Sequence, residues 1–244
     1  MIEIKLFKDT DIKGYTLIEA FPGAGLVGSM AGSYIIEKLK MEYVGYIDSD
    51  AFPPIATIHN NLPMFPARIY RNDKAKFVVV ISEFTIPSSI LYQLGRELLS
   101  FVREYGIGSI ISIGGMPSQK PGSKLYLTSP DPGIIKKANT LGISTISDGV
   151  VAGVSAVLMT NAAQFKIPVT DLLVEVNPTV MDPKYAEIAI AGLNKILGTN
   201  IDLTDLEKEA KMVESKIKTL VKSTKDSHET YDKATDAAGP SMYA

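Results

Sequence analysis

The stretch Phe21-Pro22-Gly23-Ala24-Gly25-Leu26-Val27-Gly28 decides the fold of this chain. The apolar run before it, residues 15–21, predicts a β-strand. After it, residues 26–40 place apolar side chains at helical spacing and gather their charges at the far end. Three glycines within six positions indicate a positive φ, or the close approach of another backbone or a ligand. The stretch therefore predicts a strand, a tight turn and a helix.

The same glycines have two interpretations. Gly23, Gly25 and Gly28 form the pattern G-x-G-x-x-G, and Asp48 lies 20 residues past Gly28 (48 − 28), at the end of the next apolar run. In dinucleotide-binding proteins such glycines let a pyrophosphate approach a helix N-terminus, and an acid at about this distance binds the ribose. The alternative is that the glycines only permit a tight turn and close packing of the helix on the sheet.

The composition is that of an ordinary globular protein. The chain has 244 residues, of which 45% are hydrophobic and 21% charged, and a net charge of −2. That length suits one large α/β domain or two small ones, and the charge does not indicate a nucleic-acid surface. There is no apolar run of the roughly 18 residues needed to cross a membrane, and the N-terminus lacks a signal-peptide layout. We interpret the protein as cytoplasmic.

Residues that usually carry catalysis or bind metals are scarce. The chain has no cysteine, which excludes disulfides, thiolate metal sites and a cysteine nucleophile. It has two histidines, His59 in a segment rich in proline and asparagine and His228 in a polar tail. Both contexts favour a surface histidine over a catalytic triad or a metal ligand. The sequence therefore predicts neither a catalytic set, nor a metal site, nor a cofactor.

Strands and helices alternate along most of the chain. Strands are expected at residues 43–47, 76–81, 109–113, 143–146 and 170–176, and helices at 88–105, 131–141, 149–165 and 182–197. Asp131-Pro132 and Asp182-Pro183 each predict an N-cap followed by proline in the first helical turn. Because several strands are apolar on both faces, we expect a three-layer α/β/α fold with a mostly parallel central sheet. This core domain is expected to span residues 1–200.

The segment 51–66 contains four prolines and is unusually apolar for a loop. It cannot form a central strand over its whole length. It is expected either to pack on the core or to expose an apolar patch that binds a partner. The next segment, residues 67–81 with a turn at Asn72-Asp73, predicts a β-hairpin.

The C-terminal part differs from the core. Thr204 and Glu207 form a capping box, which predicts an amphipathic helix over residues 201–222. Residues 223–244 contain almost no apolar side chains until the end, so they are expected to form a flexible tail. The tail ends in Met242-Tyr243-Ala244, where an apolar residue and a tyrosine stand beside the terminal carboxylate. Such an end could bind a groove on a partner protein.

Three segments together resemble the proteasome assembly chaperone family, and in particular its archaeal homologues. These are residues 21–28, residues 113–117 (Ile-Gly-Gly-Met-Pro) and residues 148–154 (Asp-Gly-Val-Val-Ala-Gly-Val). The resemblance covers roughly residues 12–196. It implies a three-layer α/β/α fold, a homo-oligomer that is expected to be a tetramer, and no catalysis.

The resemblance also gives the C-terminus a role. Met242-Tyr243-Ala244 is similar to the hydrophobic-Tyr-any terminus with which proteasome activators bind the α-ring of the 20S core particle. By that likeness, Met242 is the apolar anchor, Tyr243 the specificity residue and Ala244 the residue that carries the carboxylate. The function implied is that of an ATP-independent assembly factor or activator of the proteasome.

Two other hypotheses remain. The first is a nucleotide- or small-molecule-binding protein, or an enzyme, that uses Gly23, Gly25, Gly28 and Asp48. In that case Glu83 and Asp148, at strand ends, are the best remaining candidates for a catalytic carboxylate. Helix capping or loop hydrogen bonds would also explain both residues. The chain has no P-loop lysine, so ATP-driven unfolding is not expected. The second is a structural oligomer with an inert tail.

Overall fold

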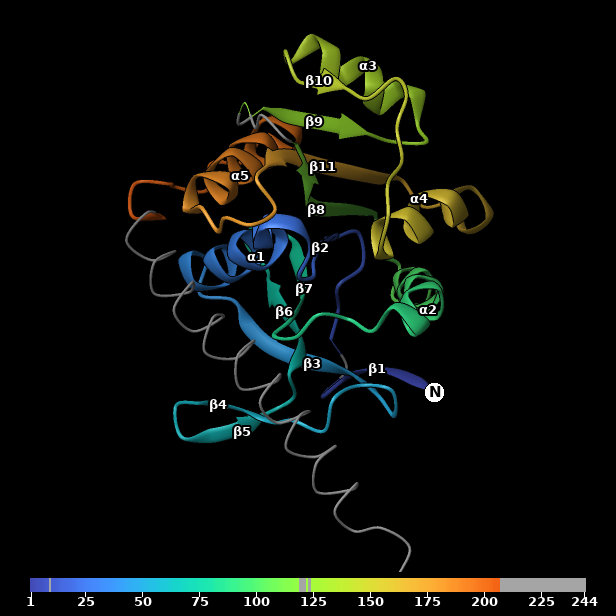
Figure 1. Cartoon of the computed structure of the whole chain (residues 1–244). Helices are drawn as coiled ribbons and strands as arrows, with labels where there is room; N and C mark the ends of the chain where they lie inside the picture. Colours follow the sequence, from blue (N-terminus) through green and yellow to red (C-terminus); the bar gives the residue numbers. More distant parts are fainter. Residues whose placement is uncertain (9, 119–121, 123, 207–244) are drawn as a thin grey trace, which may run out of the picture.

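The computed structural model describes residues 1–8, 10–118, 122 and 124–206. Within them, helices cover both faces of one large sheet (Figure 1). In spatial order its strands are β1 (Ile2–Leu6), β3 (Glu42–Ser49), β6 (Ala67–Asn72), β7 (Phe77–Ser82), β2 (Thr16–Ala20), β8 (Ser109–Pro117), β11 (Val169–Val176), β9 (Leu125–Thr128) and β10 (Ser144–Thr145). A separate hairpin joins β4 (Thr57–His59) to β5 (Leu62–Met64).

The sheet is mixed, so the expectation of a mostly parallel sheet is wrong. Strands β7, β2, β8 and β11 are parallel neighbours, as are β9 and β10. Antiparallel pairs join β1 to β3, β3 to β6, β6 to β7 and β11 to β9, and β4 to β5 in the separate hairpin. Five of the nine pairings among the described residues are therefore antiparallel. A short link such as the one between β6 and β7 permits only an antiparallel pair, because a parallel pair needs a long crossover.

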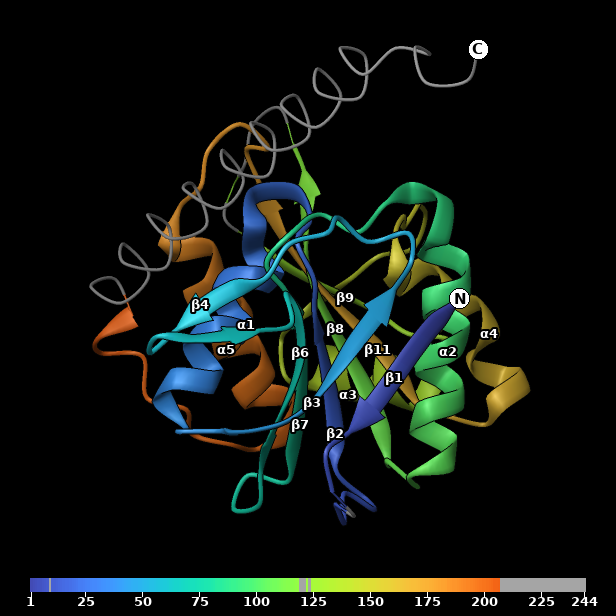
Figure 2. The ribbon, with the colours of Figure 1, turned by 90° about the horizontal axis from the view of Figure 1, so that it is seen from below.

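The helices form two layers. Helices α1 (Val27–Lys38) and α5 (Pro183–Leu197) cover one face of the sheet, and α2 (Leu91–Glu104) and α4 (Val154–Phe165) cover the other (Figure 1). Helix α3 (Pro132–Thr140) lies at the β9–β10 edge, and the 3-10 turns η1 (Ala24–Leu26) and η2 (Ser88–Ile90) precede α1 and α2. Seen along the sheet from the β1 edge, the two helical layers flank the strands (Figure 2). Each layer buries its own apolar core against the sheet.

The helix caps that the sequence predicts are confirmed. The Asp131 carboxylate accepts a hydrogen bond from the Gly133 amide at 2.7 Å, and the Asp182 carboxylate accepts one from the Lys184 amide at 2.9 Å. Gly198 ends α5 with a φ of 68°. These local signals hold because an N-cap aspartate and a C-terminal glycine each satisfy backbone groups that the helix leaves free.

The expected start of the helix at residues 149–165 is wrong. Helix α4 begins at Val154, and Gly153, with a φ of 87°, breaks the chain before it. Residues 149–153 form a loop instead. A left-handed glycine at this position cannot continue a helix, so the small apolar residues before it line a surface rather than pack inside a helix.

The glycine-rich turn is shaped by close packing. A Cβ at Gly28 would lie 2.5 Å from the Ile113 carbonyl oxygen and 2.7 Å from that of Phe21. Gly25 has a φ of 63°, and a Cβ there would lie 3.1 Å from the Cβ of Val176. Gly23, by contrast, has open space where its Cβ would be. Two of the three glycines therefore have a structural requirement, which is to let α1 approach the ends of β2, β8 and β11.

The proline-rich segment packs on the core in one part and exposes apolar side chains in another. Phe52 is buried against Phe84, and the Phe65 ring stacks on Tyr46 with 3.9 Å between centroids. The tip of the β4–β5 hairpin is open, with Ile58 and Leu62 each 65% exposed.

A buried arginine fixes this hairpin to the sheet. Arg68 on β6 is 1% exposed and donates hydrogen bonds to the Thr57 hydroxyl at 2.7 Å, to the Phe65 carbonyl at 3.0 Å and to the Glu83 carboxylate. The His59 ring nitrogen is 2.8 Å from the same carboxylate. Arg68 thus holds the segment in place through Thr57 and Phe65. The carboxylate of Glu83 is the partner that a buried guanidinium needs, and it also binds His59 of the hairpin.

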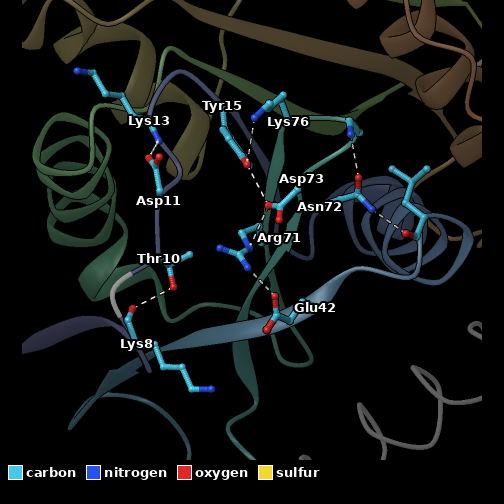
Figure 3. A network of polar contacts seen from close by, with 12 residues as sticks. Lys8, Thr10, Asp11, Lys13, Tyr15, Glu42, Arg71, Asn72, Asp73 and Lys76 are labelled. Carbon is cyan, nitrogen blue, oxygen red and sulfur yellow. Dashed lines mark hydrogen bonds and ion pairs between the residues drawn. The ribbon is translucent and has the colours of Figure 1, made fainter.

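A second polar network lies at the amino ends of β2 and β7 (Figure 3). The Tyr15 hydroxyl donates to Asp73 at 2.9 Å, and Arg71 bridges Asp73 at 3.2 Å and Glu42 at 2.8 Å. The Asn72 amide donates to the Leu39 carbonyl at the end of α1. These contacts join β2, β3 and the β6–β7 turn at the edge where the central strands begin.

Replacing Gly28 by alanine should destabilise the fold by at least about 2 kcal/mol, because the new Cβ would collide with two backbone oxygens that cannot turn away. The helical preference of alanine, worth about 1 kcal/mol, acts in the opposite direction and is smaller. Urea denaturation followed by circular dichroism measures the change.

Gly23→Ala is the matched control. It makes the same chemical change five residues earlier, where no heavy atom lies within 4 Å of the new Cβ. We expect it to change the free energy of unfolding by less than about 1 kcal/mol. Equal effects of the two substitutions would contradict the packing role of Gly28.

Candidate functional site

A cavity of about 450 Å³ opens where β2 and β8 end. Its walls come from the turn that leads into η1, the start of α2, the loop 146–153 and the first turn of α4. Most of the lining is apolar, including Phe21, Ile86, Leu91, Ile113, Val151 and Leu173. The carboxyl ends of parallel strands are where open α/β sheets bind ligands.

Polar side chains on three adjacent strands form a row, and two of them lie at the floor of this cavity. Glu19 on β2 pairs with Ser112 on β8, and Ser112 pairs with Asp171 on β11. Glu19 and Ser112 line the cavity, and Asp171 follows one strand further along the row. They are 5%, 1% and 0% exposed, respectively. Because side chains alternate along a strand, all three face the layer of α2 and α4, as do Leu17, Ile110 and Val169.

The two carboxyl groups of the row have unequal surroundings. Glu19 accepts hydrogen bonds from the Phe21 amide at 3.0 Å and from the Ser112 hydroxyl. Neither carboxyl oxygen of Asp171 has a hydrogen-bond partner among the described residues. Glu19 is therefore the better placed of the two to hold a negative charge, because hydrogen bonds to a carboxylate stabilise its ionised form.

Burial dominates the titration of both groups. It raises the pKa of Glu19, and the hydrogen bonds from Ser112 and Phe21 offset part of that effect. Burial, followed by repulsion from Glu19, raises the pKa of Asp171 to about 7, although the nearby Ser155 hydroxyl lowers it in part. Asp171 thus stays protonated over much of the pH range in which carboxyl groups on a protein surface are ionised.

The other ionisable residue of the lining is also acidic. Asp148 lies on the loop before α4, and the described residues of the lining include no lysine, arginine or histidine. The cavity therefore has acids at its floor and rim and no compensating positive side chain.

The structure separates the residues of the predicted dinucleotide motif. Gly23 lines the cavity, whereas Gly25 and Gly28 meet Val176, Ile113 and Phe21. Asp48 lies exposed on β3, and β6 and β7 stand between that strand and β2. The acid that would bind a ribose is thus not beside the turn that would bind the pyrophosphate.

The other candidates of the sequence lie elsewhere. Glu83 binds Arg68 and His59 under the β4–β5 hairpin, which is a structural arrangement, and Asp148 stands at the rim of the cavity. Met242, Tyr243, Ala244 and His228 lie outside the described residues, as does most of the expected helix 201–222.

Sequence reasoning missed Glu19, Ser112 and Asp171. The available signal was a polar residue inside an apolar strand, as in Leu17-Ile18-Glu19-Ala20 and Val169-Thr170-Asp171-Leu172. A buried acid is costly, so one at such a position marks a special environment. What the sequence could not supply was the register that aligns the three residues.

The described part of the chain offers neither a metal cluster nor a membrane-spanning helix. It contains no cluster of three or more histidine or acidic side chains arranged to hold a metal ion. None of its helices is long and apolar enough to cross a lipid bilayer.

Comparison with known proteins identifies the family. The sequence model of the PAC2 family matches residues 17–221. The chain belongs to the PAC2 family. Uncharacterized protein MJ0106 of Methanocaldococcus jannaschii is 30% identical to this PAC2 protein over 204 residues, which are 84% of each chain.

Solved structures share the fold. Pyrococcus furiosus PbaA, an archaeal homolog of proteasome-assembly chaperone, superposes with a TM-score of 0.82 at 25% identity, over 93% of this PAC2 protein and 100% of that chain. Pyrococcus furiosus PbaB, an archaeal proteasome activator, superposes with a TM-score of 0.75 at 22% identity, over 90% and 98% of the two chains. The resemblance of the sequence to the archaeal homologues of this chaperone family is thereby confirmed at the level of family and fold.

The raised pKa of Asp171 predicts how stability depends on pH. Between its ordinary value of 3.8 and about 7, the folded state keeps a proton on Asp171 that the unfolded state has lost. Stability from this residue therefore falls as the pH rises through that window, by up to about 1.4 kcal/mol per pH unit. Asp171→Asn should remove this slope, so its stability relative to the parent should increase from pH 5 to pH 8 in urea titrations.

Asp148→Asn serves as the control for this prediction. Asp148 lines the same cavity but is exposed. Its replacement removes an exposed acid from the same cavity and should leave in place the pH dependence that Asp171 imposes. A constant difference between Asp171→Asn and the parent from pH 5 to pH 8 would show that Asp171 does not hold a proton in the folded state.

Proposed function

We propose that this PAC2 protein is an ATP-independent, proteasome assembly chaperone-like factor that binds the α-ring of the 20S core particle through its C-terminus. The observation that carries the proposal is the likeness to PbaA, which extends over 93% of the chain at 25% identity. The second support is the sequence of the C-terminus, in which Met242 provides an apolar anchor, Tyr243 the specificity and Ala244 the carboxylate. The bound protein acts as an assembly factor or as an activator.

The structure supports this proposal through the segment that leads to the C-terminus. After α5, the Tyr34 hydroxyl of α1 donates to the Asp202 carbonyl at 2.7 Å, and Leu206 is 1% exposed in the core beneath α1 and α5. Lys38 of α1 bridges the carboxylates of Asp202 and Asp205, each at 3.0 Å. The 38 residues that follow Leu206 (244 − 206) therefore start from a fixed point on the α1 side of the molecule.

The charges of Lys38, Asp202 and Asp205 stabilise one another. Hydrogen bonds from the Thr204 amide and hydroxyl, and then from Lys38, lower the pKa of Asp202 to about 2. The bonds to Asp202 and Asp205 raise the pKa of Lys38. The contact thus keeps its charges at every pH at which a cytoplasmic protein works.

Several such C-termini would act together. A three-residue anchor binds weakly alone, whereas several anchors on one body raise the effective concentration of each. We propose a cytoplasmic homotetramer, which would present four C-termini to one α-ring. In this function the fold serves as a scaffold and needs neither catalysis nor a cofactor.

Removal of Met242–Ala244 should abolish binding to an archaeal 20S core particle, and Tyr243→Ala should weaken binding at least about tenfold, the equivalent of one lost contact of 1.4 kcal/mol. Surface plasmon resonance with immobilised core particle, without nucleotide, measures both effects. Circular dichroism checks that each variant keeps its fold.

Ser241→Ala, the residue just before the motif, is the matched control and should bind as the parent does. Tyr92→Ala removes a tyrosine of α2 that is 61% exposed and should also bind normally. If the truncated protein binds the core particle as tightly as the parent, the C-terminus is not the docking element and the proposal fails.

A further inference from the structure

The cavity at the ends of β2 and β8 is not needed for a scaffold that works through its C-terminus. At about 450 Å³ it falls in the range of small-molecule sites, roughly 300–1,000 Å³. Its apolar walls suit an apolar ligand body, and Glu19 and Ser112 place polar groups on its floor. We propose that this cavity binds a small organic amine, whose ammonium group pairs with Glu19 and whose apolar body fills the space between the loop 146–153 and the start of α2.

The charge of the site determines the class of ligand. Glu19 and Asp148 are the ionisable residues of the described lining, and both are acidic. Asp171, 0% exposed, adds a second buried carboxyl group on the same face of the sheet, one strand from Ser112. An anion would meet repulsion from the carboxylate of Glu19, whereas a cation would supply the positive charge that the described lining lacks.

The hydrogen-bonding state of the row points in the same direction. The two carboxyl oxygens of Glu19 each accept one hydrogen bond, which leaves capacity for further donors. A primary ammonium group has three N–H donors and no acceptor. It therefore matches a floor of carboxyl and hydroxyl oxygens better than a neutral alcohol, which has one donor.

The N-terminus of α4 is the one feature of the site that favours an anion. The N-cap residue is Gly153, so no side chain caps the backbone amides of the first turn. A helix end acts as roughly half a positive charge, however, whereas the ionised carboxylate of Glu19 supplies a full negative charge. The balance favours a cation.

Three probes with the same apolar body separate these possibilities. Isothermal titration of the full-length protein would compare 2-phenylethylamine, the neutral 2-phenylethanol and the anionic 3-phenylpropionate. We expect the amine to bind at least about tenfold more tightly than the alcohol, the equivalent of 1.4 kcal/mol, and the anion to bind more weakly than either.

Two substitutions locate the binding. Glu19→Gln should lower the affinity for the amine at least about tenfold and leave the alcohol unchanged, since one charge is worth at least one such factor in a buried site. Asp48→Asn makes the same loss of charge on β3, far from the cavity in the strand order, and should change neither. Ala152→Phe places a large ring at an exposed position of the rim and should weaken the binding of amine and alcohol alike.

Ala152→Phe keeps the test valid even if Glu19→Gln fails to fold. The proposal is overturned if the alcohol or the anion binds as tightly as the amine, if folded Glu19→Gln binds the amine unchanged, or if Ala152→Phe has no effect. Absence of amine binding at about 10 mM, weaker than the millimolar affinities of small fragments, overturns it as well. Removal of Met242–Ala244 should leave amine binding intact, so this result is independent of proteasome binding.

Discussion

The close approach of α1 to the ends of the central strands is the constraint on which the rest of the structure depends. It is possible only because Gly28 has no side chain where the carbonyl oxygens of Phe21 and Ile113 pass. Gly115 on β8 meets the Ala24 carbonyl in the same way. With the turn held against β8, residues 21–24 become one wall of the cavity. Packing and backbone conformation thereby account for Gly25 and Gly28, two of the three glycines in a pattern that resembles a nucleotide motif.

The fold also accommodates buried charge in two different ways. Arg68 is neutralised by Glu83 and also donates hydrogen bonds to Thr57 and Phe65, so it ties the β4–β5 hairpin to the sheet. The row of Glu19 and Asp171 has no such cation among the described residues. A protein selected only for stability would replace such a row with apolar side chains, because an unpaired buried carboxyl group is costly. The row of Glu19, Ser112 and Asp171 is therefore a candidate functional site.

Local signals in the sequence were enough for much of the fold. The caps at Asp131 and Asp182 and the β6–β7 hairpin follow from side chains that act on their nearest backbone neighbours. The edge strand β1 and the short strand β9 were missed, because their antiparallel pairing with β3 and β11 depends on residues far along the chain. For the same reason the candidate site could be predicted only in part. Gly23 and Asp148 were noted, but the alignment of Glu19, Ser112 and Asp171 is a property of the assembled sheet.

The place of β2 in the middle of the sheet has a consequence for biosynthesis. Its two neighbours are β7 and β8, so Thr16 finds its partners at Phe77 and Ser109, which are 61 and 93 residues later (77 − 16 and 109 − 16). At translation rates of about 5–20 residues per second, the second partner emerges roughly 5–20 s after β2. During that time an apolar strand and its glycine turn leave the ribosome without their sheet. A member of a family with chaperone homologues thus passes through its own interval of aggregation risk while it is being made.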